Sequence, residues 1–158
     1  MNANGVITVS SEYYRSKALG HSVDEGPYPM ERITDGNDLT FWASDSHTLG
    51  WMNYDLNTPQ TIVEVTVGVR LDCCSDRYKD MCVTMNGIDG SKLAEKCTTG
   101  ERGEPFLSSD ERDIIVPFNS IKDVKSIKVI FNDNQFGQIR TLVVKGFAGL
   151  NKNFPNFF

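Results

Sequence analysis

The sequence has no long apolar run, no cluster of basic residues and only two histidines, and each shortage excludes a class of protein. No stretch approaches the ~20 apolar residues that a membrane-spanning helix needs, so we expect no membrane insertion. The net charge is −5 and the lysines and arginines are dispersed, which argues against a nucleic-acid partner. With two histidines and no repeated Cys-x2-Cys pair, the spacing of a four-ligand zinc site is also missing.

Recognisable catalytic motifs are absent as well. The chain contains no Gly-x-Ser-x-Gly, no phosphate-binding Walker loop, no glycine-rich dinucleotide fingerprint and no His-Glu-x-x-His. Carboxylates are plentiful, but none is paired in a way that would separate an acid from a base. We therefore predict a protein without enzymatic activity, glycosidase activity included.

The four cysteines favour an oxidising compartment over a metal site. Residues 1–5 lack the pattern of a signal peptide, so either the protein is intracellular or Met1 begins a mature domain. Cys73 and Cys74 are adjacent, and either they bridge each other or they are two thiols, one buried and one paired elsewhere. An adjacent bridge would leave Cys82 and Cys97 as the second pair, whose loop of about 15 residues contributes about 3 kcal/mol. We expect a secreted protein.

What the chain does contain is a series of short segments in which apolar and polar residues alternate, separated by turn residues. Its length and its nine phenylalanines indicate one globular domain, and no segment shows a long helical period. Residues 91–96 could form a helical turn or a strand. We expect a turn at residues 57–60 and strands at residues 6–10, 51–56, 61–69, 81–85, 113–118, 124–131 and 141–147. This pattern predicts an all-β sandwich or barrel.

The most unusual stretch follows the strand expected at residues 61–69. It holds Arg70, Asp72, Cys73, Cys74 and Arg77. Two guanidinium groups offer fixed forks of donors that suit an oxygen-rich ligand, and a carboxylate between them can hold their orientation. A surface cluster of ion pairs without a ligand would show the same residues.

This stretch resembles the signature of the F-type lectins (fucolectins), which is a histidine, a long spacer and then Arg-x-Asp-x4-Arg. Here the signature is His47, 22 intervening residues, Arg70, Asp72 and Arg77, with a Trp-x-x-x-Asp-Leu segment in the spacer. The spacer is a few residues shorter than in the fish members. The resemblance extends over residues 33–149 and implies a discoidin-like (F5/8 type C) jelly-roll β-sandwich. A single domain over residues 1–150 and a tail over 151–158 are expected.

The resemblance implies a site for terminal α-L-fucose on glycans, in which His47, Arg70 and Arg77 hydrogen-bond the sugar. Asp72 would orient the arginines. Fucose carries a methyl group in place of a polar arm, and an aromatic lining favours it. The apolar contacts are expected from the Cys73–Cys74 bridge and from Phe41 or Trp42, although a tryptophan or a single histidine is more often an ordinary structural residue.

The same resemblance implies a calcium ion that supports the loops of the site. Calcium prefers six to eight hard oxygens. Two family ligands, a cysteine and a glutamate in the last strand, are valines here, and Asp38 and Asp45 are the carboxylates that could replace the glutamate. Asp-Gly-Asn at residues 35–37 could also be only a turn. The positions aligned with calcium ligands are Arg32, Asp35, Asn37, Ser44, Val143 and Val144.

Members of the family serve in innate recognition of microbes and, in some molluscs, in sperm proteins that bind egg coats. The resemblance therefore implies a secreted lectin domain, used as a tandem repeat or a homo-oligomer because one monosaccharide buries little surface. Two alternatives remain. One is a discoidin-like adhesion module that binds protein or lipid through apolar loop tips around Phe41 and Trp42, and the other is a glycan-binding appendage of a larger protein.

Overall fold

The computed structural model describes residues 5–13, 26–45, 49–132 and 136–148, and these are almost entirely strands and loops. One short 3-10 helix, η2, covers Met30–Ile33. No helix in the described ranges is long and apolar enough to cross a membrane. The strands are β1 (Gly5–Val9), β2 (Trp42–Ala43), β3 (Trp51–Gly68), β4 (Met81–Asn86), β5 (Lys92–Cys97), β6 (Asp113–Phe131), β7 (Gln138–Ile139) and β8 (Thr141–Ala148).

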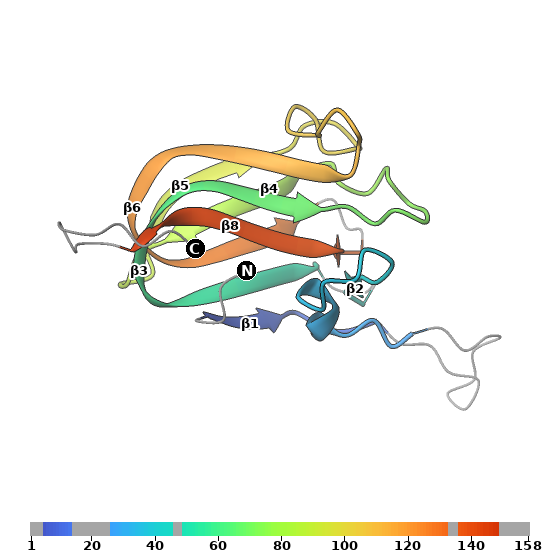
Figure 1. Ribbon diagram of the computed structural model, residues 1–158, viewed down its shortest axis with the longest axis horizontal. Helices are drawn as coiled ribbons and strands as arrows, with labels where there is room; N and C mark the ends of the chain where they lie inside the picture. Colours follow the sequence, from blue (N-terminus) through green and yellow to red (C-terminus); the bar gives the residue numbers. More distant parts are fainter. Residues whose placement is uncertain (1–4, 14–25, 46–48, 133–135, 149–158) are drawn as a thin grey trace.

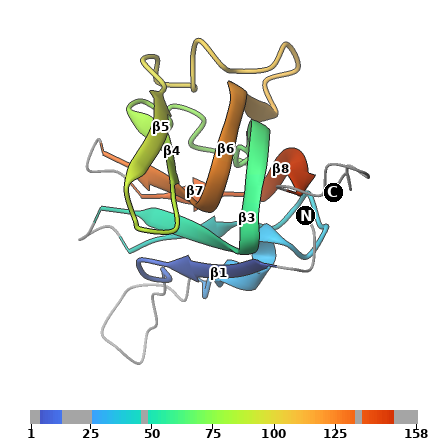
Figure 2. The same ribbon diagram turned by 90° about the vertical axis from the view of Figure 1, so that its left-hand side faces the viewer.

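Two long antiparallel strands, β3 and β6, form the centre of the fold. They pair along most of their length in a sheet of order β1-β3-β6-β4-β5, and β8 pairs with the second half of β3. Both strands curve back at the same end of the molecule, so that each contributes to two opposed layers (Figures 1 and 2). The prediction of an all-β sandwich is confirmed.

Because β3 and β6 are curved and continuous, two expected breaks between strands are wrong. The turn predicted at residues 57–60 does not end a strand, since β3 runs through it with register shifts between Asp55 and Glu64. The strands predicted at 113–118 and 124–131 are likewise one strand, and Ser120 and Asp123 within it have φ values of 53° and 58°. Irregular residues of this kind bend a strand without ending it. Residues 91–96, for which helix and strand were both open, belong to strand β5.

The apolar faces of the two layers enclose one continuous core. Trp42, Tyr78, Met81 and Phe131 are among its largest side chains, and each is at most 1% exposed. Short strands β2 and β7 pair at the end opposite the bend, Trp42 with Ile139 and Ala43 with Gln138. This pair was not predicted, because two residues carry no periodic pattern. The end of the molecule that holds β2 and β7 also holds the loop after β3 (Figure 1).

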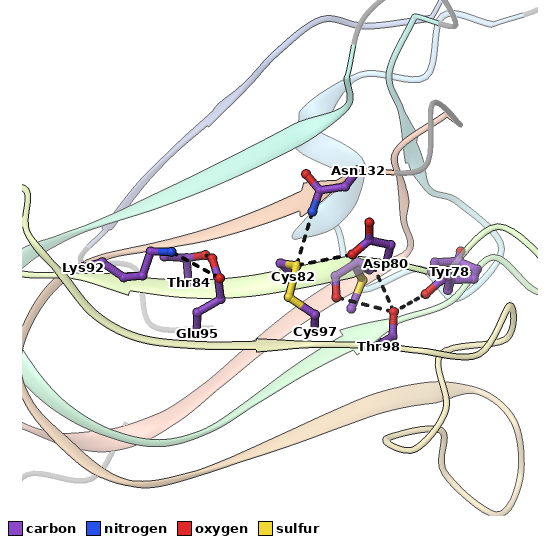
Figure 3. The surroundings of a disulfide bond; sticks show 10 residues. Tyr78, Asp80, Cys82, Thr84, Lys92, Glu95, Cys97, Thr98 and Asn132 are labelled. Carbon is purple, nitrogen blue, oxygen red and sulfur yellow. Dashed lines mark hydrogen bonds and ion pairs between the residues drawn. A yellow bond between two sulfur atoms is a disulfide. The ribbon is translucent and has the colours of Figure 1, made fainter.

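Both disulfides suggested by the cysteine spacing are present, Cys73–Cys74 and Cys82–Cys97. Cys82 and Cys97 face each other across β4 and β5, and Asn132 Nδ2 lies 3.2 Å from Cys82 Sγ (Figure 3). Asp80 completes the one group of three potential metal ligands found in the described part of the chain. Because its two sulfurs are bonded to each other, this group offers no thiolate to a metal.

Candidate functional site

The loop between β3 and β4 is fixed to the core at both ends by Tyr78. The Tyr78 side chain is fully buried, and its hydroxyl accepts a hydrogen bond of 2.7 Å from the Arg70 main-chain N–H. Burial raises the pKa of the Tyr78 hydroxyl, so it remains neutral. The Tyr78 carbonyl in turn accepts a hydrogen bond from Thr98 Oγ1 (Figure 3). The main chain at Arg70 is thus tied directly to the core.

The Arg70 guanidinium is held on two sides. Its Nε and one terminal nitrogen donate to the two Asp72 carboxylate oxygens at 2.6 and 3.0 Å, a bidentate pair. Its carbon lies 4.0 Å from the centre of the Phe41 ring, within the range of a cation–π contact. The hydrogen bond from Arg70 lowers the pKa of the Asp72 carboxyl, which stays ionised at neutral pH. Asp72 therefore orients Arg70. It makes no ion pair with Arg77 among the described residues, so the prediction that Asp72 orients both arginines holds for Arg70 alone.

Arg77 and the adjacent disulfide complete this side of the site. The Arg77 guanidinium lies over the Phe136 ring, 4.9 Å from its centre. Cys74 has a φ of 65°, in the left-handed region that residues other than glycine rarely adopt. Cys73 is exposed and Cys74 half-buried. Each arginine thus lies on an aromatic ring, with the disulfide between them along the chain.

These groups surround a pocket of about 230 Å³. The size is suited to a small molecule such as a monosaccharide. Its walls come from five separate places in the chain, and four of them lie outside the loop that carries the arginines. The lining residues are Tyr13, Tyr28, Ala43, Arg70, Cys73, Cys74, Arg77, Phe136 and Gln138.

The wall formed by Phe136 and Gln138 depends on a close approach of backbones at Gly137. A Cβ added there would lie 2.9 Å from the Phe131 ring and 3.0 Å from the Trp42 ring. The Gly137 N–H also donates to Ser44 Oγ at 2.7 Å, and the Ser44 N–H donates to the Gly137 carbonyl at 2.9 Å. These contacts hold β7 against β2. They also place the side chains on either side of Gly137, Phe136 and Gln138, in the same pocket as the arginines.

Arg140, directly after β7, joins three segments beneath the site. Its side chain is 5% exposed, and its Nε donates to the Val69 carbonyl at 3.1 Å. A terminal nitrogen donates to the Arg112 carbonyl at 3.0 Å and to Asp113 Oδ1 at 2.7 Å, and the other pairs with Asp38. Arg140 therefore holds the end of β3 from which the arginine loop begins.

Comparison with known proteins identifies this architecture. Residues 32–99 match the family model described as the NedA-like, galactose-binding domain of the F5/F8 type C group. A Streptococcus pneumoniae fucose binding module superposes with a TM-score of 0.68 at 18% identity, covering 88% of this chain and 89% of that one. The chain has the F5/8 type C fold. The predicted discoidin-like jelly roll is confirmed.

The chain is also similar to two further proteins, one in structure and one in sequence. The fucolectin of striped bass (Morone saxatilis) serum superposes with a TM-score of 0.64 at 16% identity, covering 92% of this chain and 47% of that one. The predicted resemblance to the F-type lectins is thus confirmed at the level of the fold. A fowlpox virus protein, "Protein A11 homolog", is 31% identical over 99 residues, which are 62% of this chain. The match spans 34% of the viral protein, about a third of its length.

Within the F5/8 type C fold, the predicted sugar-binding residues separate into three groups. Arg70, Cys73, Cys74 and Arg77 line one pocket, with Asp72 bound to Arg70. Phe41 and Trp42 do not line it: Phe41 lies beneath Arg70, and Trp42 is fully buried with its indole N–H donating to the Ser11 carbonyl at 3.0 Å. Adjacent aromatic residues had suggested that one would face the ligand, but both are covered by neighbouring segments. His47 lies outside the described residues, as does the predicted tail at 151–158.

The aromatic walls that sequence reasoning missed are Tyr13, Tyr28 and Phe136. Tyr13 and Tyr28 stack with ring centres 6.0 Å apart, and Phe136 meets Tyr13 edge to face at 5.3 Å. They come from distant positions in the chain, so no local spacing could have joined them. The Phe136-Gly137-Gln138 sequence carried a weak signal, a glycine between a large ring and an amide.

The residues aligned with calcium ligands fit an ion only in part. Asp35 and Asn37 lie on one exposed turn, where Asp35 accepts hydrogen bonds from the Asn37 N–H at 2.8 Å and the Thr40 hydroxyl at 2.5 Å. The Thr40 hydroxyl, followed by the Asn37 N–H, lowers the pKa of the Asp35 carboxyl, so it is ionised at neutral pH. Ser44 is buried, and its hydroxyl is already bound by the Gly137 N–H.

The remaining aligned positions bring no carboxylate. Arg32, Val143 and Val144 could offer only main-chain oxygens, and the side chain of Val144 is in the core. Asp38, considered as a replacement for the missing glutamate, is bound to Arg112 at 3.1 Å and to Arg140. Among the aligned positions, Asp35 and Asn37 bring the exposed side-chain oxygens that would face a cation, and Asn37 Oδ1 also accepts a hydrogen bond from the Leu39 N–H at 2.9 Å. A cation held there would brace the turn before Phe41.

Proposed function

We propose that this domain binds terminal α-L-fucose on glycans and does so without catalysis. The observation that carries the proposal is the pocket in which Arg70, held flat by Asp72 and Phe41, lies beside Arg77 and the Cys73–Cys74 disulfide. The fucose binding module and the fucolectin that share the fold support this choice of sugar.

The chemistry of the pocket suits a deoxy sugar. Arginine forks donate to hydroxyl and ring oxygens, and His47, whose position comes from the family signature, would accept from a hydroxyl that also receives an arginine donor. The disulfide and the rings of Tyr13, Tyr28 and Phe136 offer apolar surface to the ring carbons and the methyl group. Because a monosaccharide buries little surface, we expect modest affinity per site and partners that present several fucosylated chains.

The two disulfides agree with secretion, and extracellular glycans are the expected partners. Innate recognition or cell adhesion would then be the biological setting, with the domain used in tandem or as a homo-oligomer. Attachment of this domain to a larger protein is consistent with the viral relative, of which the chain covers a third.

Calorimetric titration with L-fucose tests the proposal, with L-galactose, which differs from L-fucose only by a hydroxyl at C6, as the control. We expect saturable binding of fucose and much weaker binding of galactose, whose hydroxymethyl group would be poorly solvated against the apolar wall. An absence of heat with millimolar fucose would overturn the proposal.

Removal of the adjacent disulfide should weaken binding without unfolding the domain. In the double variant Cys73→Ser/Cys74→Ser the pocket loses the apolar sulfur surface and the turn set by the bridge, while Cys82–Cys97 still joins β4 and β5. We expect about tenfold weaker fucose binding and a melting temperature within a few degrees of the parent. Equal affinity in this variant would show that the bridge is not part of the binding surface.

Calcium support of the neighbouring loop is a separate prediction. We expect calcium to raise the melting temperature and a chelator to reverse the rise, because an ion bound only by the folded state stabilises it. Asp35→Asn, which removes the carboxylate of the turn, should abolish the calcium response while Asp110→Asn, in another exposed loop, retains it. A calcium response that is the same in Asp35→Asn as in the parent would rule out this site.

A second candidate function is adhesion to protein or lipid through apolar loop tips. Phe41 and Trp42 cannot serve as those tips because both are buried, but Leu39 and Leu71 are 89% and 43% exposed and border one small hollow. Vesicle binding that is lost in Leu39→Ser, together with no response to fucose, would favour this function over sugar binding.

A further inference from the structure

Gln138 is the one lining residue of the pocket whose buried polar atom is left without a partner in the described structure. The residue is 2% exposed, and its Oε1 accepts no hydrogen bond from any described residue. Buried amide groups in folded proteins are nearly always hydrogen-bonded, and one left unpaired costs about 1–3 kcal/mol. An apolar side chain of the same size would avoid that cost.

The position of Gln138 explains where a partner would come from. The residue lines the same pocket as Arg70, Arg77 and the Cys73–Cys74 disulfide, and its main chain is fixed by the pairing of β7 with Ala43 in β2. The Gly137 contacts with Ser44 hold the adjacent peptide as well. Because the main chain is fixed and the residue is buried, the amide is shielded from bulk water.

We infer that Gln138 is a ligand-binding residue of this pocket, and that its side-chain amide bonds a sugar hydroxyl which neither arginine engages. The inference rests on the proposed function and adds a specificity-determining residue to it. Arginine groups can only donate hydrogen bonds, so they cannot accept from a hydroxyl proton. Gln138 adds an acceptor facing the same ligand.

The amide suits a hydroxyl in either of its two orientations. Exchanging the oxygen and nitrogen of a glutamine side chain changes its unpaired atom from an acceptor to a donor. A hydroxyl can both donate and accept, so it satisfies the amide in both cases. A ligand that lacked a hydroxyl at this point would leave the amide unpaired, and the pocket would discriminate against it.

Gln60 provides a matched control elsewhere in the molecule. Its Oε1 is also buried without a partner among the described residues, while its Nε2 donates to Thr58 Oγ1 at 3.2 Å. Gln60 lies between two register shifts in β3 and does not line the pocket. It therefore shares the unsatisfied amide but not the pocket.

The test compares Gln138→Met and Gln60→Met with the parent protein, using L-fucose titration and thermal melting. Each change removes an unsatisfied buried oxygen, and Gln60→Met loses in addition only an exposed hydrogen bond to Thr58, so we expect both variants to melt within a few degrees of the parent. Only Gln138→Met should lose affinity, by about tenfold, the value of one hydrogen bond to a ligand. If Gln138→Met does not fold, Gln138→Asn, whose shorter amide falls short of the sugar, takes its place with the same expected loss.

Three monodeoxy derivatives of methyl α-L-fucoside identify the hydroxyl. The parent should bind each derivative more weakly than the full sugar, but one of them should lose no further affinity in Gln138→Met, because the partner of Gln138 is already gone. Equal fucose affinity in Gln138→Met and the parent would overturn the inference while leaving the proposed function intact. The inference would also be overturned if Gln138→Met lowered the affinity for all three derivatives by the same factor as for the full sugar. A parent protein that does not bind fucose would instead refute the proposed function.

Discussion

Replacing Arg70 by lysine should reduce fucose affinity about 100-fold while the domain stays folded. The lysine keeps the charge but loses the planar fork, so it cannot bind Asp72 through two parallel hydrogen bonds or lie flat on the Phe41 ring. The substitution therefore removes the hydrogen bonds of the guanidinium to the sugar and leaves the lysine ammonium without a fixed orientation. Calorimetric titration of Arg70→Lys with L-fucose measures the effect.

Arg102→Lys is the matched control for this change. Arg102 also pairs with a carboxylate, Glu111, but both side chains are largely exposed and neither lines the pocket. We expect parent-like fucose affinity in that variant. If Arg70→Lys bound fucose as well as Arg102→Lys, Arg70 would not have the role assigned to it.

Replacing Arg140 by leucine should destabilise the domain by about 3 kcal/mol, which corresponds to a fall of roughly 6–12 °C in melting temperature for a domain of this size. The buried guanidinium bonds the Val69 and Arg112 carbonyls and two carboxylates, and leucine leaves the carbonyls without those donors. Chemical denaturation and thermal melting both report the loss.

Arg112→Leu separates burial from charge in this prediction. Arg112 pairs with the same Asp38 carboxylate, but its side chain is 44% exposed, and exposed ion pairs are worth less than about 1 kcal/mol. A loss in Arg112→Leu as large as in Arg140→Leu would mean that the charge of Asp38, and not the buried position of Arg140, is what matters.

The part of the site that could be predicted consists of residues that lie close together in the sequence. Arg70, Asp72, Cys73, Cys74 and Arg77 share one loop, so spacing alone brought them together. The tyrosines and the β7 residues on the other walls come from segments far apart in the chain, and only the fold places them there. A pocket at the end of a β-sandwich is built from loops that connect different strands. Sequence spacing can therefore join the residues of one loop but not those of separate loops.

The same distinction holds for the fold. Alternation identified most strands correctly, but it could not show that residues 57–60 and 119–123 are bends within β3 and β6 and not loops between shorter strands. Polar and turn-forming residues occur in both cases. Which outcome is adopted depends on pairing with neighbouring strands, which the local sequence does not contain.

The continuity of β3 and β6 through both layers has a consequence for how the domain comes apart. Since each strand is hydrogen-bonded in both layers, neither layer can separate without breaking the pairing of the other. Unfolding should therefore be a single cooperative transition, and the central amides of both strands should exchange with solvent only when the whole domain opens. The pocket at the far end then persists until that global transition.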